Sequence, residues 1–288
     1  MAETPSASSF ARIRRRGASG IVGALVAVIV LVAPSAVAAQ GPYPRSIAST
    51  GDSITRAYNT GTIPYTDNAS RSWATGTSST VNSHYLRLLA LNPKIYGKTY
   101  NDAKSGARMA DLAGQMSAVV AQKAEYVTVL MGGNDVCTSS EASMTSVASF
   151  RSQFVTAMER VTTALPRTRI FVATIPNVHR LWEVFKDNAL ARFVWDLFDV
   201  CQSMLANPLS TNQADVDRRE RVLQREQDFN AALLDVCAAY THCKSDGGAV
   251  FATDFTSADV TGRDYFHPST AGQAKLAAAT WAVSYWAP

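Results

Sequence analysis

The sequence lacks internal repeats, low-complexity blocks and any Pro-, Gly- or Ser-rich linker long enough to divide it. It also lacks a hydrophobic run that could span a bilayer comfortably, because the longest, residues 21–32 ("IVGALVAVIVLV"), has only twelve residues. The first absence argues against several domains. We therefore predict that residues 39–288 form one well-cored domain.

Residues 1–38 have the features of an export signal that is removed from the mature protein. Arg12 and Arg14–Arg16 make a positively charged start, residues 21–32 form the apolar segment, and Ala36–Ala38 supply a small-x-small cleavage site. We predict cleavage directly after this site and a secreted protein. A retained N-terminal anchor is the alternative.

An excess of charge of one sign is also absent once this segment is removed. Residues 1–38 hold 4 of the 27 basic residues and 1 of the 23 acidic residues, so the remaining chain has a net charge of +1. Neither a nucleic-acid partner nor an acidic surface is therefore expected.

Cysteine is sparse but even in number. Four cysteines in an exported chain suggest two disulfides, for which three connectivities exist. Our hypothesis joins Cys237 to Cys243 in a small ring and Cys137 to Cys201 across a long loop. The alternative, a zinc site at Cys237, His242 and Cys243, is disfavoured because their spacing fits no structural zinc pattern.

Apolar runs of strand length alternate with stretches of helical periodicity. The predicted strands cover residues 46–50, 98–102, 125–131, 169–175 and 249–255. The predicted helices cover roughly residues 81–91, 108–122, 144–165, 216–240 and 270–286. This alternation predicts an α/β fold with a mostly parallel sheet covered on both faces, in which functional loops gather at the carboxyl ends of the strands.

The tripeptide Gly51-Asp52-Ser53 stands where the first predicted strand ends. A glycine permits a tight turn there, and the serine hydroxyl would lie at the functional edge of the sheet. An ordinary strand-to-helix turn, capped by Asp52 or Ser53, is the alternative. A serine nucleophile needs a base, a group that orients the base, and hydrogen-bond donors for the oxyanion.

Three further stretches supply such groups. "NDAKSGARMADL" places Gly106 after the second predicted strand, where its amide could face an oxyanion, and "VTVLMGGNDV" brings the side-chain NH2 of Asn134 to the same edge. "GRDYFHPSTAG" places Asp264 three residues before His267, close enough to hold the second nitrogen of the imidazole. Each group could instead be a turn or capping residue, but their common placement favours a hydrolytic site.

Other arrangements of nucleophile and base are weaker. No G-x-S-x-G motif surrounds Ser53, which argues against the α/β-hydrolase elbow. His84 lies in a predicted helix, and His242 adjoins Cys243. His179 follows the fourth predicted strand and is a candidate for substrate contact.

The motifs "GDS", "SG" after "ND", "GGND" and "DYFHP" resemble the four sequence blocks of the SGNH, or GDSL, hydrolase superfamily. The chain as a whole resembles secreted actinobacterial-type lipases and esterases of this superfamily. The resemblance implies Ser53 as the nucleophile, His267 as the base and Asp264 as its orienting residue. It also implies an oxyanion hole made of the Ser53 and Gly106 N–H groups and the Asn134 side chain. The implied fold is a three-layer, flavodoxin-like α/β/α sandwich with a five-stranded parallel sheet.

The segment 177–225 is longer than a simple crossover between strands requires. Its apolar residues recur at helical spacing and predict an amphipathic helix or helix pair that ends at Pro208. These residues are Trp182, Phe185, Ala189, Phe193, Leu197, Cys201 and Leu205. The segment could add a packing layer, or it could cap the cleft, with Trp182 as a second substrate-contact candidate. A Cys137–Cys201 bond would tether such a cap to the Asn134 loop.

The predicted function is that of a secreted serine hydrolase that cleaves carboxylic esters, of lipid or other acyl type, through an acyl-enzyme on Ser53. The alternatives are an O-deacetylase acting on acetylated polysaccharide and a non-catalytic exported binding protein. The expected partner is an ester substrate, held at a lipid surface if it is a lipid. No metal or organic cofactor is required, and a monomer is expected.

Overall fold

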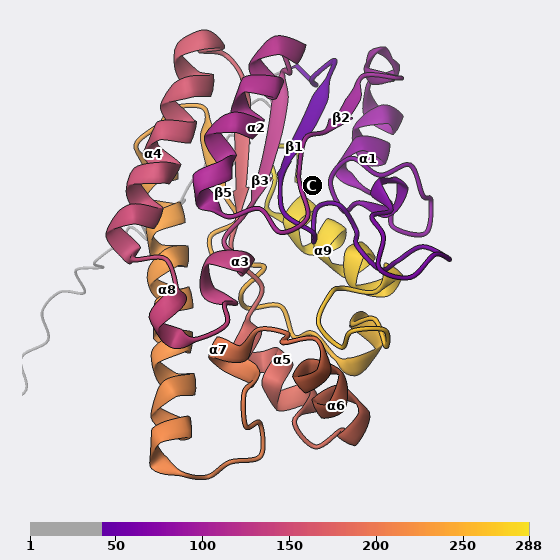
Figure 1. Ribbon diagram of the computed structural model, residues 1–288. Helices are drawn as coiled ribbons and strands as arrows, with labels where there is room; N and C mark the ends of the chain where they lie inside the picture. Colours follow the sequence, from indigo (N-terminus) through magenta and orange to yellow (C-terminus); the bar gives the residue numbers. More distant parts are fainter. Residues whose placement is uncertain (1–41, 288) are drawn as a thin grey trace, which may run out of the picture. The chain divides into compact units, whose positions relative to one another are not determined.

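A five-stranded sheet lies at the centre of the computed structural model, which describes residues 42–287 (Figure 1). The strands are β1 Ile47–Gly51, β2 Thr99–Asn101, β3 Tyr126–Leu130, β4 Arg169–Ala173 and β5 Cys243–Ser245, in the spatial order β2-β1-β3-β4-β5. Every neighbouring pair is parallel. The predicted export signal, residues 1–38, lies outside the described residues.

Helices cover both faces of this sheet. Those of the described residues are α1 His84–Leu91, α2 Met109–Gln122, α3 Gly133–Val136, α4 Val147–Ala164, α5 Val178–Phe185, α6 Ala189–Leu197, α7 Gln202–Leu205, α8 Gln213–Ala238 and α9 Thr270–Ala282. Short 3-10 turns occur at Ala69–Arg71, Pro93–Ile95, Glu141–Ser143 and Ser257–Asp259. Because α2, α4 and α8 pack on one face and α1 and α9 on the other (Figure 1), the predicted three-layer α/β/α fold is confirmed.

Two hydrophobic cores follow from the alternation of side chains along the strands. Ala48, Val127 and Val172 point into the core shared with α2, α4 and α8. Tyr126 and Phe171 point into the opposite core, which α1 and α9 complete. The central strands are buried on both faces, so β3 and β4 read as nearly continuous apolar runs rather than as an alternating pattern. β1 is also fully buried, but it consists mainly of small residues, IASTG.

The prediction of the fifth strand was wrong. Residues 249–255 form turns, and β5 is the preceding segment Cys243–Ser245. The carboxylate of Asp246 organises these turns, because it accepts hydrogen bonds from the N–H groups of Gly248 and Val250 at 3.0 and 2.9 Å. β5 is a short edge strand with no fully buried residue, so it carries no apolar signal in the sequence.

The segment 177–225 also differs from its prediction. It forms three short helices, α5, α6 and α7, and the first half of α8 instead of one amphipathic helix or a helix pair. Asn188 starts α6 by accepting hydrogen bonds from the N–H groups of Leu190 and Ala191, both at 3.0 Å. The new helix has its own buried face, which leaves Phe193 and Leu197 60% and 58% exposed. Although their spacing from Trp182 is helical, Phe193 and Leu197 therefore do not share a buried helix face with it.

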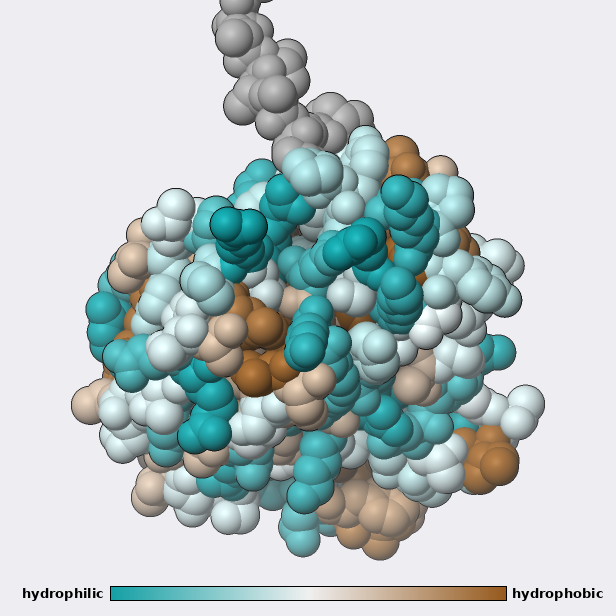
Figure 2. Space-filling view, turned by 90° about the horizontal axis from the view of Figure 1, so that it is seen from above, coloured by the Kyte–Doolittle hydropathy of each residue, from teal (hydrophilic) through white to brown (hydrophobic). Residues whose placement is uncertain are grey.

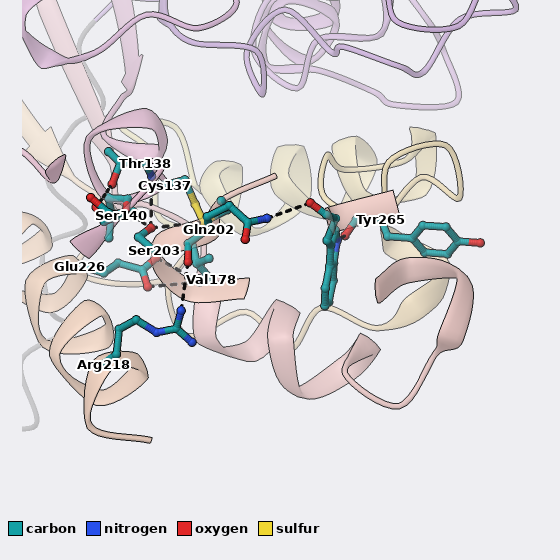
Figure 3. Close-up of a disulfide and its surroundings, with 12 residues drawn as sticks. Cys137, Thr138, Ser140, Val178, Gln202, Ser203, Arg218, Glu226 and Tyr265 are labelled. Atoms are coloured by element: carbon teal, nitrogen blue, oxygen red, sulfur yellow. Dashed lines mark hydrogen bonds between the residues drawn. A yellow bond between two sulfur atoms is a disulfide. The ribbon is translucent and has the colours of Figure 1, made fainter. Parts of the chain in front are cut away.

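Two disulfides link helices to neighbouring parts of the fold. Cys137–Cys201 joins the end of α3 to the start of α7, and Cys237–Cys243 joins α8 to β5. This is the pairing of our hypothesis. Beside the first bond, the Ser203 hydroxyl donates to the carbonyl oxygen of Val136 at 2.7 Å. Figure 3 shows Ser203 and its neighbours around this bond. The α3 and α7 segments are thus held together covalently and by hydrogen bonds.

The face at the amino ends of the strands is mainly hydrophilic. Figure 2 looks onto this face, where hydrophilic side chains surround a small hydrophobic hollow. Arg45, Lys94, Arg167 and Arg169 line a hollow near the starts of β1, β3 and β4, together with Glu125. Among the described helices, none combines the length and the hydropathy that crossing a membrane would require.

Candidate active site

β1 ends in a tight turn that presents Ser53 at the carboxyl edge of the sheet. Gly51 has a φ of +144°, and a Cβ there would lie 2.3 Å from the carbonyl oxygen of Leu130, so glycine is required. The Asp52 Oδ1 atom accepts a hydrogen bond from the N–H of Ile54 at 2.9 Å, which closes the turn. Because β1 pairs with both β2 and β3, Ser53 lies where the strand order reverses, the usual place of a ligand crevice.

Ser53, His267 and Asp264 form one hydrogen-bonded row. The Ser53 Oγ and His267 Nε2 atoms are 2.8 Å apart, and His267 Nδ1 lies 2.8 Å from Asp264 Oδ2. With the proton of the neutral imidazole on Nδ1, this nitrogen donates to the carboxylate and Nε2 accepts from the hydroxyl. The ring of Tyr58 contacts the imidazole with a centroid distance of 4.8 Å. The structure therefore brings together Ser53 and the Asp264–His267 pair, although Ser53 and His267 lie 214 positions apart in the sequence.

The carboxylate of Asp264 is nearly buried, with an exposed fraction of 7%. Burial acts to raise the pKa of Asp264, but hydrogen bonds and the charge of His267 outweigh it and hold this pKa below its ordinary value. Two of these bonds come from the N–H groups of Phe266 and His267 to Oδ1, at 2.9 and 3.0 Å. Asp264 is thus an ionised acceptor for the imidazole across the neutral pH range.

Asp52, the neighbour of Ser53, has the opposite electrostatic character. Its side chain is 1% exposed, and Oδ2 has no hydrogen-bond partner among the described residues. Burial raises the pKa of Asp52 to about 6, although the hydrogen bond from Ile54 and the charge of His267 act to lower it. A carboxyl group that titrates near neutral pH therefore lies directly beside the Ser53 turn.

Three groups that the sequence analysis named as oxyanion donors have at least one hydrogen without a protein acceptor among the described residues. Gly106 has a φ of +81°, and the space where a Cβ would stand is empty, so its backbone is open to a ligand. Within residues 42–287 the N–H groups of Ser53 and Gly106 have no protein acceptor. The Asn134 side chain donates one hydrogen to the carbonyl oxygen of Ala107 at 2.9 Å, which leaves its second hydrogen free to donate elsewhere.

Two buried side chains that the sequence did not single out join these loops to one another. The Gln115 side chain on α2 accepts from the N–H of Gly51 and donates to its carbonyl oxygen, both at 2.8 Å. Asp135 accepts from the N–H of Met109 at 2.9 Å, which connects the Asn134 loop to the start of α2. Asp135 was visible in the "GGND" motif, whereas nothing in the sequence around Gln115 points to Gly51.

An apolar pocket of about 70 Å³ opens beside Ser53 and Asn134. One wall is α5, which contributes Val178, Leu181 and Val184. The remaining apolar lining comes from Ile54, Ile175, Pro176, Phe255, Val260, Phe266 and Pro268. Asp52, Asn177, Thr256 and Asp259 line it as well, but most of the lining is apolar, which suits a hydrocarbon segment.

The wall of this pocket is fixed from behind by α8. The buried Glu226 carboxylate accepts from the N–H of Val178 through both oxygens, at 3.1 and 3.2 Å (Figure 3). Asn230, one turn further on, accepts from the N–H of Ile175 at 2.8 Å. Burial raises the pKa of Glu226 well above its ordinary value. Both residues lie in a helix whose sequence shows only an amphipathic pattern, so this role was not predictable from the sequence.

The two candidates for substrate contact lie elsewhere. His179 and Trp182 line a separate hollow with Pro208 and Arg219, and neither is among the described residues that line the pocket at Ser53. The Trp182 indole N–H donates to the carbonyl oxygen of Pro208 at 2.9 Å. His84 is buried, and its two ring nitrogens are hydrogen-bonded to the hydroxyl groups of Tyr126 and Thr280. His267 is therefore the histidine placed at the serine.

No group of three or more His, Cys, Asp or Glu side chains is arranged to hold a metal ion in the described part of the chain. Cys237, Cys243 and His242, the alternative zinc site of the sequence, include both sulfur atoms of one disulfide. These sulfur atoms are not available as thiolate ligands.

Comparison with known proteins agrees with this geometry. The family model of GDSL-like lipases and acylhydrolases matches residues 47–280. A protein of Parabacteroides merdae, described as a GDSL-like lipase, has a similar structure, with a TM-score of 0.50 and 15% identity over 83% of this chain and 94% of that chain. At this identity the likeness shows the fold alone.

Two further solved structures are similar at lower scores. The extracellular lipase of Streptomyces rimosus has a TM-score of 0.47 and 16% identity over 83% of this chain and 99% of that chain. A family 3 carbohydrate esterase of Clostridium thermocellum has a TM-score of 0.46 and 14% identity over 82% of this chain and 92% of that chain. A search of curated protein sequences finds no match.

The family match covers the strand that carries Ser53, the Gly106 and Asn134 loops, and the turn with Asp264 and His267. It thus includes every element of the hydrogen-bonded row. From this match, this chain belongs to the GDSL-like lipase/acylhydrolase family and is a carboxylic ester hydrolase.

Proposed function

We propose that the protein is a secreted esterase that cleaves carboxylic esters of apolar acyl chains through an acyl-enzyme on Ser53. The observation that carries this proposal is the row Ser53–His267–Asp264, with both hydrogen bonds at 2.8 Å, at the mouth of an apolar pocket. The row supplies a nucleophile and its base, and the pocket supplies a place for the acyl chain.

The reaction would proceed in two steps of acyl transfer. Ser53 Oγ attacks the ester carbonyl carbon while His267 Nε2 takes the hydroxyl proton and then passes it to the leaving alcohol. A water molecule, deprotonated by the same nitrogen, then releases the acid from Ser53. The developing oxyanion would be held by the N–H groups of Ser53 and Gly106 and by the free hydrogen of Asn134.

The pocket supports the proposed substrate class. Val178, Leu181 and Val184 of α5 offer only hydrocarbon surface next to the serine. Each buried CH₂ group of a substrate gains about 0.8 kcal/mol on leaving water. Longer acyl chains should therefore bind better than acetyl until the pocket is full, which favours a lipid or other acyl ester over an acetylated polysaccharide.

We also propose that residues 1–38 direct the chain out of the cytosol. The Arg-rich start, the twelve-residue apolar run and the small-residue site support this. The two disulfides support it as well, because such bonds persist in oxidising compartments. N-terminal sequencing of the exported protein would check the cleavage site, and a chain that retains residues 1–38 would contradict it.

The decisive experiment is hydrolysis of p-nitrophenyl esters from acetyl to palmitoyl by the protein from residue 39, with Ser53→Ala alongside. We expect butyryl and longer esters to exceed acetyl in kcat/KM, and Ser53→Ala to lose activity at every length. Activity confined to acetyl would instead indicate an O-deacetylase. A folded protein with no activity at any length would indicate an exported binding protein.

A variant of the pocket wall tests the acyl site separately. Val184→Trp should fill the pocket, so that the longest accepted ester becomes shorter while acetyl hydrolysis persists. Glu183→Trp on the same helix is the control, because Glu183 pairs with Arg180 and does not line the pocket. Equal chain-length profiles in the two variants would contradict the assignment of the pocket.

A further inference from the structure

The carboxylate of Asp264 has four hydrogen-bond donors. Oδ1 accepts from two N–H groups of its own turn, and Oδ2 accepts from His267 Nδ1 and from the Asn59 side-chain NH2. Three of these donors thus come from Phe266 and His267. Asn59 is the donor that comes from another part of the chain, the loop that follows Ser53.

Asn59 is held firmly in this position. Its side chain is 3% exposed, and its backbone has a φ of +64°, a conformation that asparagine adopts more readily than most residues. The Asn59 Oδ1 atom accepts from the N–H of Tyr65 at 2.5 Å. Because the oxygen of the amide faces this donor, the NH2 group must face Asp264. The orientation of the side chain is therefore fixed by its partners.

A donor at this oxygen affects the imidazole in two ways. It prevents rotation of the carboxylate out of the plane in which His267 Nδ1 donates, and it neutralises part of the negative charge that this nitrogen faces. Without the donor, Asp264 would be held only within its own turn, and Ser53 and His267 would no longer be in fixed register. A displacement of the base relative to the nucleophile slows proton transfer more than it weakens binding.

We propose that Asn59 is a positioning residue for the reaction: its NH2 group orients Asp264 and joins the turn that carries His267 to the loop that carries Ser53. The inference rests on the proposed roles of Ser53, His267 and Asp264. It goes beyond them because it adds a fourth side chain on which the alignment of the row depends.

Asn59→Asp provides a test that depends on pH. The introduced carboxyl keeps the shape of the side chain, and aspartate also tolerates a positive φ. Beside Asp264 it forms a pair of carboxyl groups that share one proton, as like charges this close cannot both ionise easily. While it is protonated, its O–H replaces the lost donor, but after deprotonation it repels Asp264.

We expect the kcat of Asn59→Asp to be within about threefold of the unchanged protein at pH 6 and at least about tenfold lower by pH 9. Asn59→Gly, which suits the backbone but removes the donor, should lower kcat about tenfold or more while KM changes less than about twofold. Its kcat relative to the unchanged protein should not fall as the pH rises. Together the variants separate loss of the donor from loss of the side chain.

Other charged groups near the row remain the same in every variant. Asp52 faces His267, and Tyr58 lies near Asp264 and Asp67. Arg263 donates to the Asn59 carbonyl oxygen at 3.3 Å. Asn68→Asp is the matched control, because it makes the same chemical change in the same loop at a side chain that bonds Ser70. Its activity relative to the unchanged protein should be independent of pH.

The outcomes divide clearly. A kcat of Asn59→Asp that follows the unchanged protein from pH 6 to 9, or an Asn59→Gly variant of normal kcat, would overturn the inference. A pH-dependent loss in Asn68→Asp equal to that in Asn59→Asp would also overturn it. If Asn59→Gly fails to fold, the change in the relative kcat of Asn59→Asp between pH 6 and pH 9 still decides the question. The same assays with Ser53→Ala test the proposed function itself, which requires that this variant is inactive.

Discussion

The side chain of Gln115 hydrogen-bonds both the N–H and the carbonyl oxygen of Gly51, each at 2.8 Å. These two bonds connect α2 to the last residue of β1, two positions before Ser53. The same helix begins at Met109, which Asp135 holds from the Asn134 loop at 2.9 Å. The turn that carries Ser53 and the loop that carries Asn134 are therefore both hydrogen-bonded to α2.

Gln115→Met is expected to lower both stability and turnover. Methionine has a similar volume but leaves the buried N–H of Gly51 without an acceptor, which costs about 1–3 kcal/mol. Urea unfolding with the disulfides intact measures this loss. Gln122→Met, at the other end of α2, is the control because Gln122 bonds Asp102 instead. An equal loss of stability in both variants would show that the hydrogen bonds between Gln115 and Gly51 are unimportant.

Asn134→Ala is expected to reduce kcat about a hundredfold, since removal of one oxyanion donor has an effect of this size in serine hydrolases. KM should change little, because the donor acts on charge that develops during the reaction. Steady-state kinetics with a butyryl ester provides both values. Turnover within a few fold of the unchanged protein would remove Asn134 from the oxyanion hole.

Asp52 predicts a dependence of stability on pH. Because its pKa is raised to about 6 in the folded protein, its contribution to stability is complete below its unfolded pKa and is lost as the pH rises to about 6. Asp52→Asn should therefore be more stable than the unchanged protein at pH 7.5, by up to about 3 kcal/mol, but not at pH 4.

Urea unfolding at the two pH values measures this difference. Asp196→Asn is the control, because Asp196 is exposed on α6, and its effect should be small at both pH values. A stability gain from Asp52→Asn that is the same at pH 4 and 7.5 would show that Asp52 does not titrate in this range.

The two disulfides should differ in their contribution to stability. The Cys137–Cys201 bond closes a loop of 64 residues and the Cys237–Cys243 bond a loop of 6. Chain entropy then gives about 4 kcal/mol for the first and about 2 kcal/mol for the second. Paired Cys→Ser variants and denaturant unfolding measure both values.

Activity distinguishes the two bonds further. Cys137→Ser with Cys201→Ser should also lower kcat, because that bond holds the end of α3 beside Asn134. Cys237→Ser with Cys243→Ser should leave kcat nearly unchanged, because that bond is remote from the row. The reverse ranking would contradict the role given to the α3–α7 connection.

Much of the fold was predictable because the residue types of the central strands reflect their burial. Strands β1, β3 and β4 are buried on nearly every residue, and their runs of apolar or small residues predicted them within about two residues. The exposed edge strand β5 has no such pattern. The prediction instead moved to residues 249–255, where Val250 is buried at the end of a turn rather than in a strand.

The candidate site was predictable where the residues follow strands or share one loop. Ser53, Gly106 and Asn134 all follow strands, and Asp264 and His267 share one turn. Asn59, Gln115 and Glu226 could not be found in this way. Each acts on a backbone or side-chain atom at least 48 positions away, and such pairings depend on the packed structure rather than on local pattern.

Ser53 and His267 are separated by 214 positions and meet only across the finished fold. The ribosome releases the segment around Ser53 before it releases the turn with Asp264 and His267. A nascent or truncated chain without that turn thus carries the proposed nucleophile but lacks its proposed base. The growing polypeptide should therefore hydrolyse no ester until that turn has been synthesised and has folded against the Ser53 loop.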